Sequence, residues 1–293
     1  MSIALASSLI VSLRLIDVHR HAAWPDGNSD EVRKEQLEEM ASNDVLVAVV
    51  AVTTPEEVDR WQVPGVVVGV SLACPRNLSE PRYKCFPETE GWADLVWLEE
   101  QVSSGKVRAL HELGPSYYGI SPANPRLDPY WALAEKFDIP VGIHTQRGPR
   151  PGGRFTTRSD PNCCPDFDPQ MGNPELLRPV LKKHPNLRIW LQHVGSGNAD
   201  YATFWPETLA LLRDFPNVYV DLSITNGAMP KEQYEETLRT LIDAGFGDRI
   251  MFGSDNLPIQ PILARLDSFD WLGDAQKTAI LHSNAERFFR ITK

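Results

Sequence analysis

The feature that most constrains the fold is a regular alternation of short β-branched runs with longer amphipathic segments. Most runs are nearly continuous in Val, Ile and Leu, as in parallel strands that are covered on both faces. The runs lie at residues 13–19, 45–52, 66–73, 107–113, 140–144, 187–193, 218–223 and 250–254. Strands that alternate with helices form a parallel sheet, and eight such units suit a chain of 293 residues. The pattern therefore predicts an α/β fold, a (β/α)₈ TIM barrel.

The segments between these runs carry helix signals. Asn173-Pro174 places a capping residue before a first-turn proline, and Gly105 and Gly245 stand where helices would stop. The expected helices are 31–42, 92–105, 128–137, 174–184, 205–215, 231–244 and, as the closing helix, 274–290. No linker rich in Gly, Pro or Ser separates a second unit, so residues 1–293 are expected to form a single domain.

Charge and composition exclude several partners. The net charge of −10 disfavours nucleic acid and anionic membranes, and no run reaches the ~18 apolar residues that a membrane helix needs. The apolar start lacks a basic region and runs directly into the first strand, which disfavours a secretory signal. The four cysteines form no CxxC pair, as expected for reduced thiols. These features favour a cytoplasmic protein and leave a homo-oligomer open.

Residues of metal-binding type stand at the carboxyl ends of five predicted strands. Active sites of barrels lie at that end. His19 and His21 are two apart, so their side chains face the same way on an extended strand. A single His-x-His is often chance, but five strands that each deliver a ligand type are not easily accidental. The alternative is a set of polar residues that merely cap the barrel. The candidate metal ligands are His19, His21, Glu112, His144, His193 and Asp255.

Six short segments resemble the amidohydrolase superfamily, specifically its amidohydrolase-related branch of barrel hydrolases. They are IDVHRH at 16–21, ALHELG at 109–114, PVGIHT at 140–145, LQHVG at 191–195, FGSDN at 252–256 and HSNAERFF at 282–289. Their order and spacing cover the chain from the first strand to its end.

The resemblance implies a binuclear site. In such a site His19, His21 and Asp255 bind one metal ion, while His144 and His193 bind a second. Glu112 would bridge the two, in a context similar to TatD-type hydrolases. The number of metals stays open, because some relatives keep one metal and a few use none.

The ligand types indicate the metal and its chemistry. Imidazole and carboxylate without thiolate suit Zn²⁺, with Mn²⁺, Co²⁺ and Fe²⁺ as alternatives, at one or two ions per chain. A metal lowers the pKa of bound water to about 7. Asp255 would accept the proton and pass it to the leaving group. We therefore expect a metal-dependent hydrolase that uses a metal-bound hydroxide to cleave an amide, lactone, ester or phosphoester bond in a small molecule.

Three other functions are alternatives. Some relatives use one metal to decarboxylate aromatic or unsaturated acids, and counting metals per chain would help to separate such a lyase from a hydrolase. A TatD-like nuclease is disfavoured by the acidic charge. A non-enzymatic binding protein is disfavoured because all six metal-ligand residues are present.

Substrate contacts are expected from the loops that follow the strands. Trp24, Tyr117 and Arg147 are the candidates, and Arg147 would pair with a carboxylate or phosphate of an anionic substrate. The alternative is that exposed loops commonly carry arginines. The long segment 145–172 is expected to be a lid or a specificity loop, the alternative being a flexible insertion without function. Its Cys163 and Cys164 are read as buried or idle thiols of unassigned role.

Four further polar residues are expected to lie outside the set of metal ligands. Asp17, in phase with His19, would support the ligands from behind. His111 alternates with Glu112 and would point outward towards a helix. His184 and His282 are expected to be bystanders.

Overall fold

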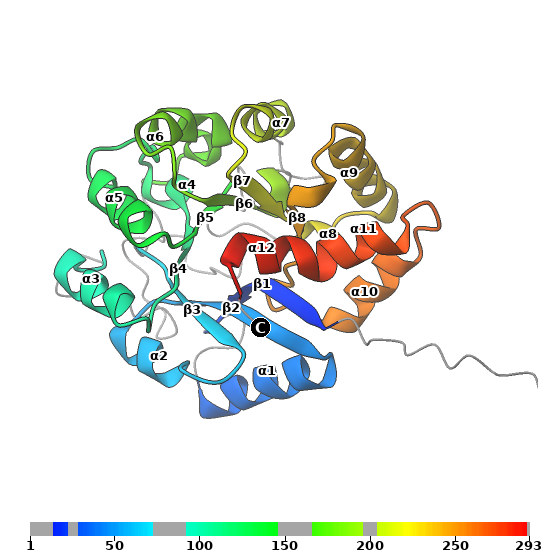
Figure 1. Ribbon diagram of the computed structural model, residues 1–293, viewed down its shortest axis with the longest axis horizontal. Helices are drawn as coiled ribbons and strands as arrows, with labels where there is room; N and C mark the ends of the chain where they lie inside the picture. The colour runs from blue at the N-terminus through cyan, green and yellow to red at the C-terminus, as the bar shows by residue number, and fades with distance from the viewer. Residues whose placement is uncertain (1–13, 23–28, 73–91, 146–165, 196–203, 292–293) are drawn as a thin grey trace, which may run out of the picture.

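The eight predicted strands form one parallel sheet in the order β1 to β8, ringed by helices (Figure 1). The computed structural model describes residues 14–22, 29–72, 92–145, 166–195 and 204–291. The strands are β1 (Leu15–His21), β2 (Val45–Val52), β3 (Val66–Val70), β4 (Ala109–Leu113), β5 (Val141–His144), β6 (Ile189–Gln192), β7 (Val218–Asp221) and β8 (Ile250–Met251). Val18 N–H donates to the Phe252 carbonyl at 3.0 Å and Asp255 N–H to that of His19 at 2.8 Å, which joins the last strand to the first. The predicted (β/α)₈ TIM barrel is confirmed.

Helices follow nearly every strand. The longer ones are α1 (Asp30–Ser42), α2 (Pro55–Arg60), α3 (Leu95–Ser103), α5 (Asp128–Phe137), α6 (Arg178–Lys183), α7 (Trp205–Asp214), α9 (Lys231–Asp243), α10 (Ile259–Asp267), α11 (Asp274–Thr278) and α12 (Asn284–Phe289). Single turns are α4 (Pro115–Tyr118), α8 (Thr225–Ala228), η2 (Pro169–Gly172), η3 (Pro174–Leu177), η4 (His193–Gly195) and η5 (Gly247–Arg249). None of the helices within the described ranges is long and apolar enough to cross a membrane.

Two of these helices, α2 and α10, are not among the predicted ones. The start of α2 is set by Thr54, whose side chain accepts the Glu57 N–H, and by Pro55 in the first turn. The expected helix 174–184 is divided, because Pro179 restarts it as α6 after η3. The expected helix 274–290 contains a π-helical turn, η6 (Ala279–Ser283), between α11 and α12.

An apolar layer fills the barrel at the amino ends of the strands. Its members come from six strands and from the closing helix: Ile16, Val18, Val47, Val49, Val67, Ala109, Trp190, Met251, Ala285, Phe288 and Phe289. In Figure 1 helix α12 lies across this end of the barrel, and the Trp190 and Phe289 rings are 5.2 Å apart. Gly142 on β5 leaves the space for the indole, because a Cβ there would lie 2.5 Å from Trp190 Cζ2. With this end filled, polar side chains can gather only at the other.

Candidate metal centre

The structure brings the six predicted ligands together at the carboxyl ends of the strands. The ligands on strands are His19 and His21 on β1, Glu112 on β4 and His144 on β5, while His193 follows β6 and Asp255 follows β8. Their ligand atoms form three overlapping groups, each within 4.8 Å. The groups are His19, His193 and Asp255; His19, His21 and Glu112; and Glu112, His144 and His193.

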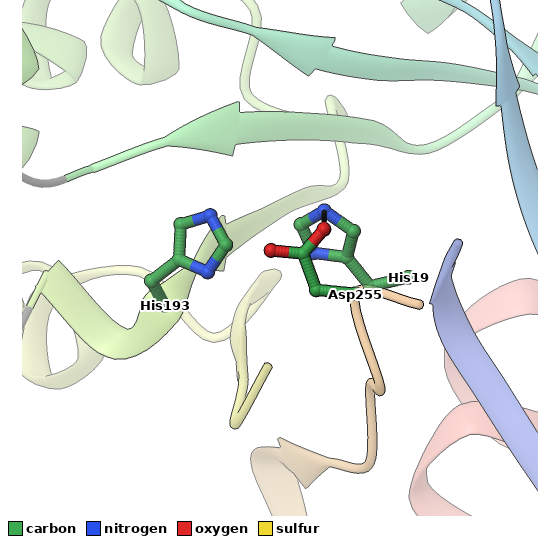
Figure 2. Close-up of side chains that lie close together, drawn as sticks. All are labelled: His19, His193 and Asp255. Carbon is green, nitrogen blue, oxygen red and sulfur yellow. Dashed lines mark ion pairs between the residues drawn. The ribbon is translucent and has the colours of Figure 1, made fainter. Parts of the chain in front are cut away.

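Glu112 lies between the histidines of β1 and those of β5 and β6. Its Oε2 is 3.0 Å from His21 Nε2, and its Oε1 is 3.8 Å from His193 Nε2. Asp255 Oδ1 is 3.0 Å from His21 Nε2 and 3.7 Å from His19 Nε2. Figure 2 shows the Asp255 carboxylate beside the His19 ring, with the His193 ring facing them from another element. The arrangement is one compact cluster of imidazole nitrogens and carboxylate oxygens.

Three of the six residues have left-handed backbone conformations. The φ angles are 53° at Glu112, 57° at His193 and 52° at Asp255. Such angles are uncommon for residues other than glycine and concentrate at functional sites. At Glu112 the left-handed residue lies within β4 and interrupts the alternation of the strand, whereas His193 and Asp255 follow β6 and β8.

His111 is the clearest correction to the sequence prediction, because it points into the barrel rather than outward. It is buried, and its ring lies 4.9 Å from that of His19 and 5.3 Å from that of Trp190. Gln192 Nε2 is 3.3 Å from its Nδ1. Gly69 on β3 makes the space, since a Cβ there would lie 2.6 Å from that of His111. Because the next residue, Glu112, has a left-handed backbone, the side chains of His111 and Glu112 both face inward.

The environment of His111 keeps its imidazole neutral. Burial, reinforced by the neighbouring imidazoles of His19 and His21, holds the pKa of His111 well below its usual value. The His111 ring therefore packs against His19 and belongs to none of the three ligand groups.

Asp17 also departs from the expected phase. The register of β1 shifts between Asp17 and Arg20, and Ile16 and Val18 face the interior. Asp17 accepts hydrogen bonds from Ser254 N at 2.9 Å and Ser254 Oγ at 2.6 Å, and pairs with buried Arg20 at 3.3 Å. It therefore fixes the backbone that carries the ligands, and these contacts are not to the imidazoles.

Asp221 and Ser223 contact the ligand histidines but are not among the residues that the sequence pattern predicts. Asp221 Oδ2 is 2.9 Å from His19 Nδ1. Ser223 Oγ is 2.9 Å from His19 Nδ1 and 3.0 Å from His193 Nδ1. The available signal was a carboxylate at the end of the apolar run VYVD in β7.

The electrostatics of the cluster favour a cation. Burial opposes charge on His193, yet the nearby carboxylates of Glu112 and Asp255 raise its pKa to about 9. Burial likewise opposes ionisation of Asp255, but the neighbouring imidazoles of His19 and His21 lower its pKa to about 2. Ionised carboxylates thus dominate the local potential.

The donor atoms fit a divalent metal. His19 Nε2 is buried and has no hydrogen-bond partner among the residues that the structure describes. Both of its nearest carboxylates, Glu112 at 4.0 Å and Asp255 at 3.7 Å, lie at the spacing of ligands around a common ion. Imidazole nitrogens and carboxylate oxygens of this kind are the ligands of catalytic Zn²⁺ and related ions.

Among the predicted substrate contacts, Tyr117 is placed next to the cluster. It is buried in α4, and its ring lies 5.5 Å from that of His144 and 5.7 Å from that of Phe167. Trp24, Arg147, most of the expected lid and its two cysteines, Cys163 and Cys164, lie outside the described residues.

The two expected bystander histidines make structural contacts. His184 lies 3.1 Å from Asp128 and 3.1 Å from Glu135, both on α5. His282 Nδ1 is 2.6 Å from the Arg14 carbonyl.

A parallel eight-stranded barrel with imidazoles and carboxylates at the carboxyl ends of its strands defines the class of metal-dependent barrel enzymes. The sequence profile of the amidohydrolase family matches residues 16–291, so the chain belongs to this family. The resemblance seen in the sequence is confirmed. Among curated proteins, none matches the chain.

Several solved structures share the barrel. A probable 2-pyrone-4,6-dicarboxylic acid hydrolase from Acinetobacter baumannii, with citric acid bound, is 12% identical with a TM-score of 0.62, covering 95% of this chain and 100% of its own. A 5-carboxyvanillate decarboxylase from Sphingomonas paucimobilis is 15% identical with a TM-score of 0.61, covering 96% and 100%.

A third structure is the 5-carboxyvanillate decarboxylase from Novosphingobium aromaticivorans, complexed with manganese and 4-hydroxy-3-methoxy-5-nitrobenzoic acid. It is 13% identical with a TM-score of 0.55, covering 88% of this chain and 80% of its own. Identities this low show a shared fold.

Proposed function

We propose that this protein is a metal-dependent hydrolase that cleaves an amide, lactone, ester or phosphoester bond in a small molecule. The observation that carries the proposal is the position of Glu112, which belongs both to a group with His19 and His21 and to a group with His144 and His193. A carboxylate shared by two ligand sets is placed to bridge two metal ions, and two-metal sites are typical of hydrolytic chemistry.

In this proposal His19, His21 and Asp255 hold one ion, and His144 and His193 hold the other. Zn²⁺ is the preferred ion because the donors are nitrogen and oxygen without thiolate, with Mn²⁺, Co²⁺ and Fe²⁺ as alternatives. When bound, the metal would acidify a water molecule and polarise the oxygen of the scissile group.

Asp255 is the proposed proton carrier. Its Oδ1 faces the cluster beside His21 and His19, at 3.0 Å and 3.7 Å from their Nε2 atoms. With its pKa lowered to about 2, by imidazole contacts that outweigh burial, the carboxylate is ionised and available as an acceptor. A carboxylate within hydrogen-bond reach of the reacting group can take up a proton and pass it to the leaving group.

We also propose the substrate contacts, the partners and the location of the enzyme. Tyr117, beside His144, would contact the substrate, together with Trp24 and Arg147. Arg147 would recognise an anionic group on a small molecule. The net charge of −10 argues against nucleic acid and anionic membranes as partners, and we expect a cytoplasmic enzyme.

A decarboxylase is the second candidate. The Tyr117 ring lies beside His144 and the Phe167 ring lies beside Tyr117, and the two rings offer an aromatic wall that suits a planar acid. Two of the similar barrels described above are decarboxylases of 5-carboxyvanillate.

The test is a substrate screen with Asp255→Asn and a matched control. Asp267→Asn removes the same charge from a side chain that is 70% exposed at the end of α10. We expect a loss of about 10²–10⁴-fold in turnover for Asp255→Asn and none for the control. Turnover of Asp255→Asn at the control's rate would remove Asp255 from the mechanism.

The same screen separates the two candidate reactions. Hydrolysis in ¹⁸O-labelled water places the label in a product, whereas decarboxylation releases carbon dioxide and adds no oxygen from water to the remaining product. Release of carbon dioxide without label in the remaining product would overturn the hydrolase in favour of the lyase.

A further inference from the structure

Asp221, the last residue of β7, and Ser223, two residues after it, contact the ligand histidines His19 and His193. Ser223 Oγ lies 2.9 Å from His19 Nδ1 and 3.0 Å from His193 Nδ1. Asp221 Oδ2 lies 2.9 Å from His19 Nδ1, and its Oδ1 accepts the His193 backbone N–H at 3.1 Å. His19 belongs to β1 and His193 follows β6, so β7 serves two elements that are not neighbours in sequence.

The donors and acceptors of this group balance in only one way. Ser223 Oγ donates its single proton to Asp221 Oδ1 at 2.5 Å. Its lone pairs are then left to accept, and the two atoms within reach are the Nδ1 atoms of His19 and His193. Both imidazoles must therefore carry a proton on Nδ1. The Ser223 carbonyl, 3.1 Å from His193 Nδ1, requires the same arrangement.

A glycine on the adjoining segment makes room for this group. A Cβ at Gly253 would lie 2.8 Å from His19 Cβ, 3.2 Å from Ser223 Cβ and 3.5 Å from Asp221 Cγ. All three of these residues are fully buried, so none has free space into which to withdraw. The absent side chain lets β1, β7 and the end of β8 meet at hydrogen-bonding distance.

We propose that Asp221 and Ser223 are a shared positioning pair that fixes the Nδ1–H form of His19 and His193 and thereby couples the two halves of the metal centre. With the proton on Nδ1, the Nε2 lone pair of each ring faces the carboxylates of the cluster. This inference rests on the proposed function, because it assumes that both Nε2 atoms bind metal.

The pairing makes a specific prediction for the isosteric change Asp221→Asn. Oδ1 is held in place by the N–H groups of Ser223 and His193 and by the serine hydroxyl. The new amide Nδ2 would then stand where Oδ2 faced His19 Nδ1, donor against donor. His19 would have to move its proton to Nε2, where it blocks metal binding.

Ser223→Ala is the milder variant and the better test of coupling. It removes the one oxygen that contacts both rings and adds no group. Ser268→Ala is the matched control, since it deletes the hydroxyl of an exposed serine that donates to the Arg265 carbonyl far along α10.

The experiment is a titration of the metal-free proteins with Zn²⁺ against a chromophoric chelator, followed by visible spectra of the Co²⁺-loaded forms. For Ser223→Ala we expect both Zn²⁺ sites to weaken by about 10–100-fold and the Co²⁺ bands to shift, with Ser268→Ala unchanged. For Asp221→Asn we expect the site that contains His19 to weaken more than the other. Circular dichroism of each metal-free variant shows whether it is folded.

The outcomes separate this inference from the proposed function. Suppose that the wild type binds two Zn²⁺ ions and that Ser223→Ala is folded. If both sites of the variant are unchanged, or if only one is weakened, the shared pair is overturned and the proposed hydrolase is not affected. A wild type that binds neither Zn²⁺ nor Co²⁺ would overturn the metal centre and the inference together.

Discussion

The substitution Gly253→Ala should damage the site through a single methyl group. The added Cβ would lie 2.8 Å from His19 Cβ, whereas carbon atoms in favourable contact are about 3.5–4.0 Å apart. Gly253 does not have a left-handed backbone, so the cost is steric and not conformational. Overpacking of this kind costs about 1–3 kcal/mol. At about 2–4 °C per kcal/mol for a large domain, the melting temperature should fall by about 2–12 °C.

The assay is thermal unfolding of the metal-free protein followed by circular dichroism, with Gly273→Ala as the control. A Cβ at Gly273 meets nothing within 4 Å, and its φ of −66° suits alanine, so the control should change stability by less than about 0.5 kcal/mol. Gly253→Ala should also weaken Zn²⁺ binding, because His19 must shift. Equal melting temperatures for the two variants would refute the close packing of His19 against this glycine.

Other changes test the frame around the site. Arg20→Met should lower the free energy of unfolding by about 3–5 kcal/mol in urea titrations, because it leaves buried Asp17 without its cation; the exposed Arg239→Met should change it little. Burial already raises the pKa of Asp17, so the loss should be smallest at acid pH, where the carboxyl is protonated, and grow as the pH rises; a loss that does not vary with pH would contradict the ionised Asp17. Gly142→Ala should cost about 1–3 kcal/mol by calorimetry, because its Cβ would lie 2.5 Å from the Trp190 indole; wild-type stability would contradict the tight interior.

The fold could be predicted because strand and helix patterns are local. All eight apolar runs contain strands, and the longest strand, β2, has the expected bounds 45–52. The ends are less certain, since β8 is only Ile250–Met251 while the apolar run continues through residue 254. The chain leaves the strand there because the next residues bend to place Asp255 at the cluster.

The ligand side chains could be gathered from the sequence because the carboxyl ends of parallel strands meet. Their orientation could not be predicted, because strict alternation assumes a regular strand. His111 faces inward because Glu112 adopts a φ of 53°, and a glutamate in the sequence gives no sign of such an angle. The shift in the register of β1 likewise puts Asp17 on the side away from the imidazoles.

The supporting pair, Asp221 and Ser223, could not be predicted from the sequence for another reason. Asp221 ends the otherwise ordinary buried strand β7 and Ser223 follows it, and their partners lie about 200 and 30 residues away along the chain. Only the closed barrel brings them together. The residues that hold a ligand in place are therefore harder to recognise than the ligands themselves.

The central claim is that Glu112 joins two metal sites, and metal content tests it most directly. Elemental analysis of the purified protein, before chelation and after metal is restored, should give about two equivalents of divalent metal per chain. Glu112→Gln should lose most of this content in the same measurement. No bound metal, even after addition of Zn²⁺ or Mn²⁺, would contradict the account.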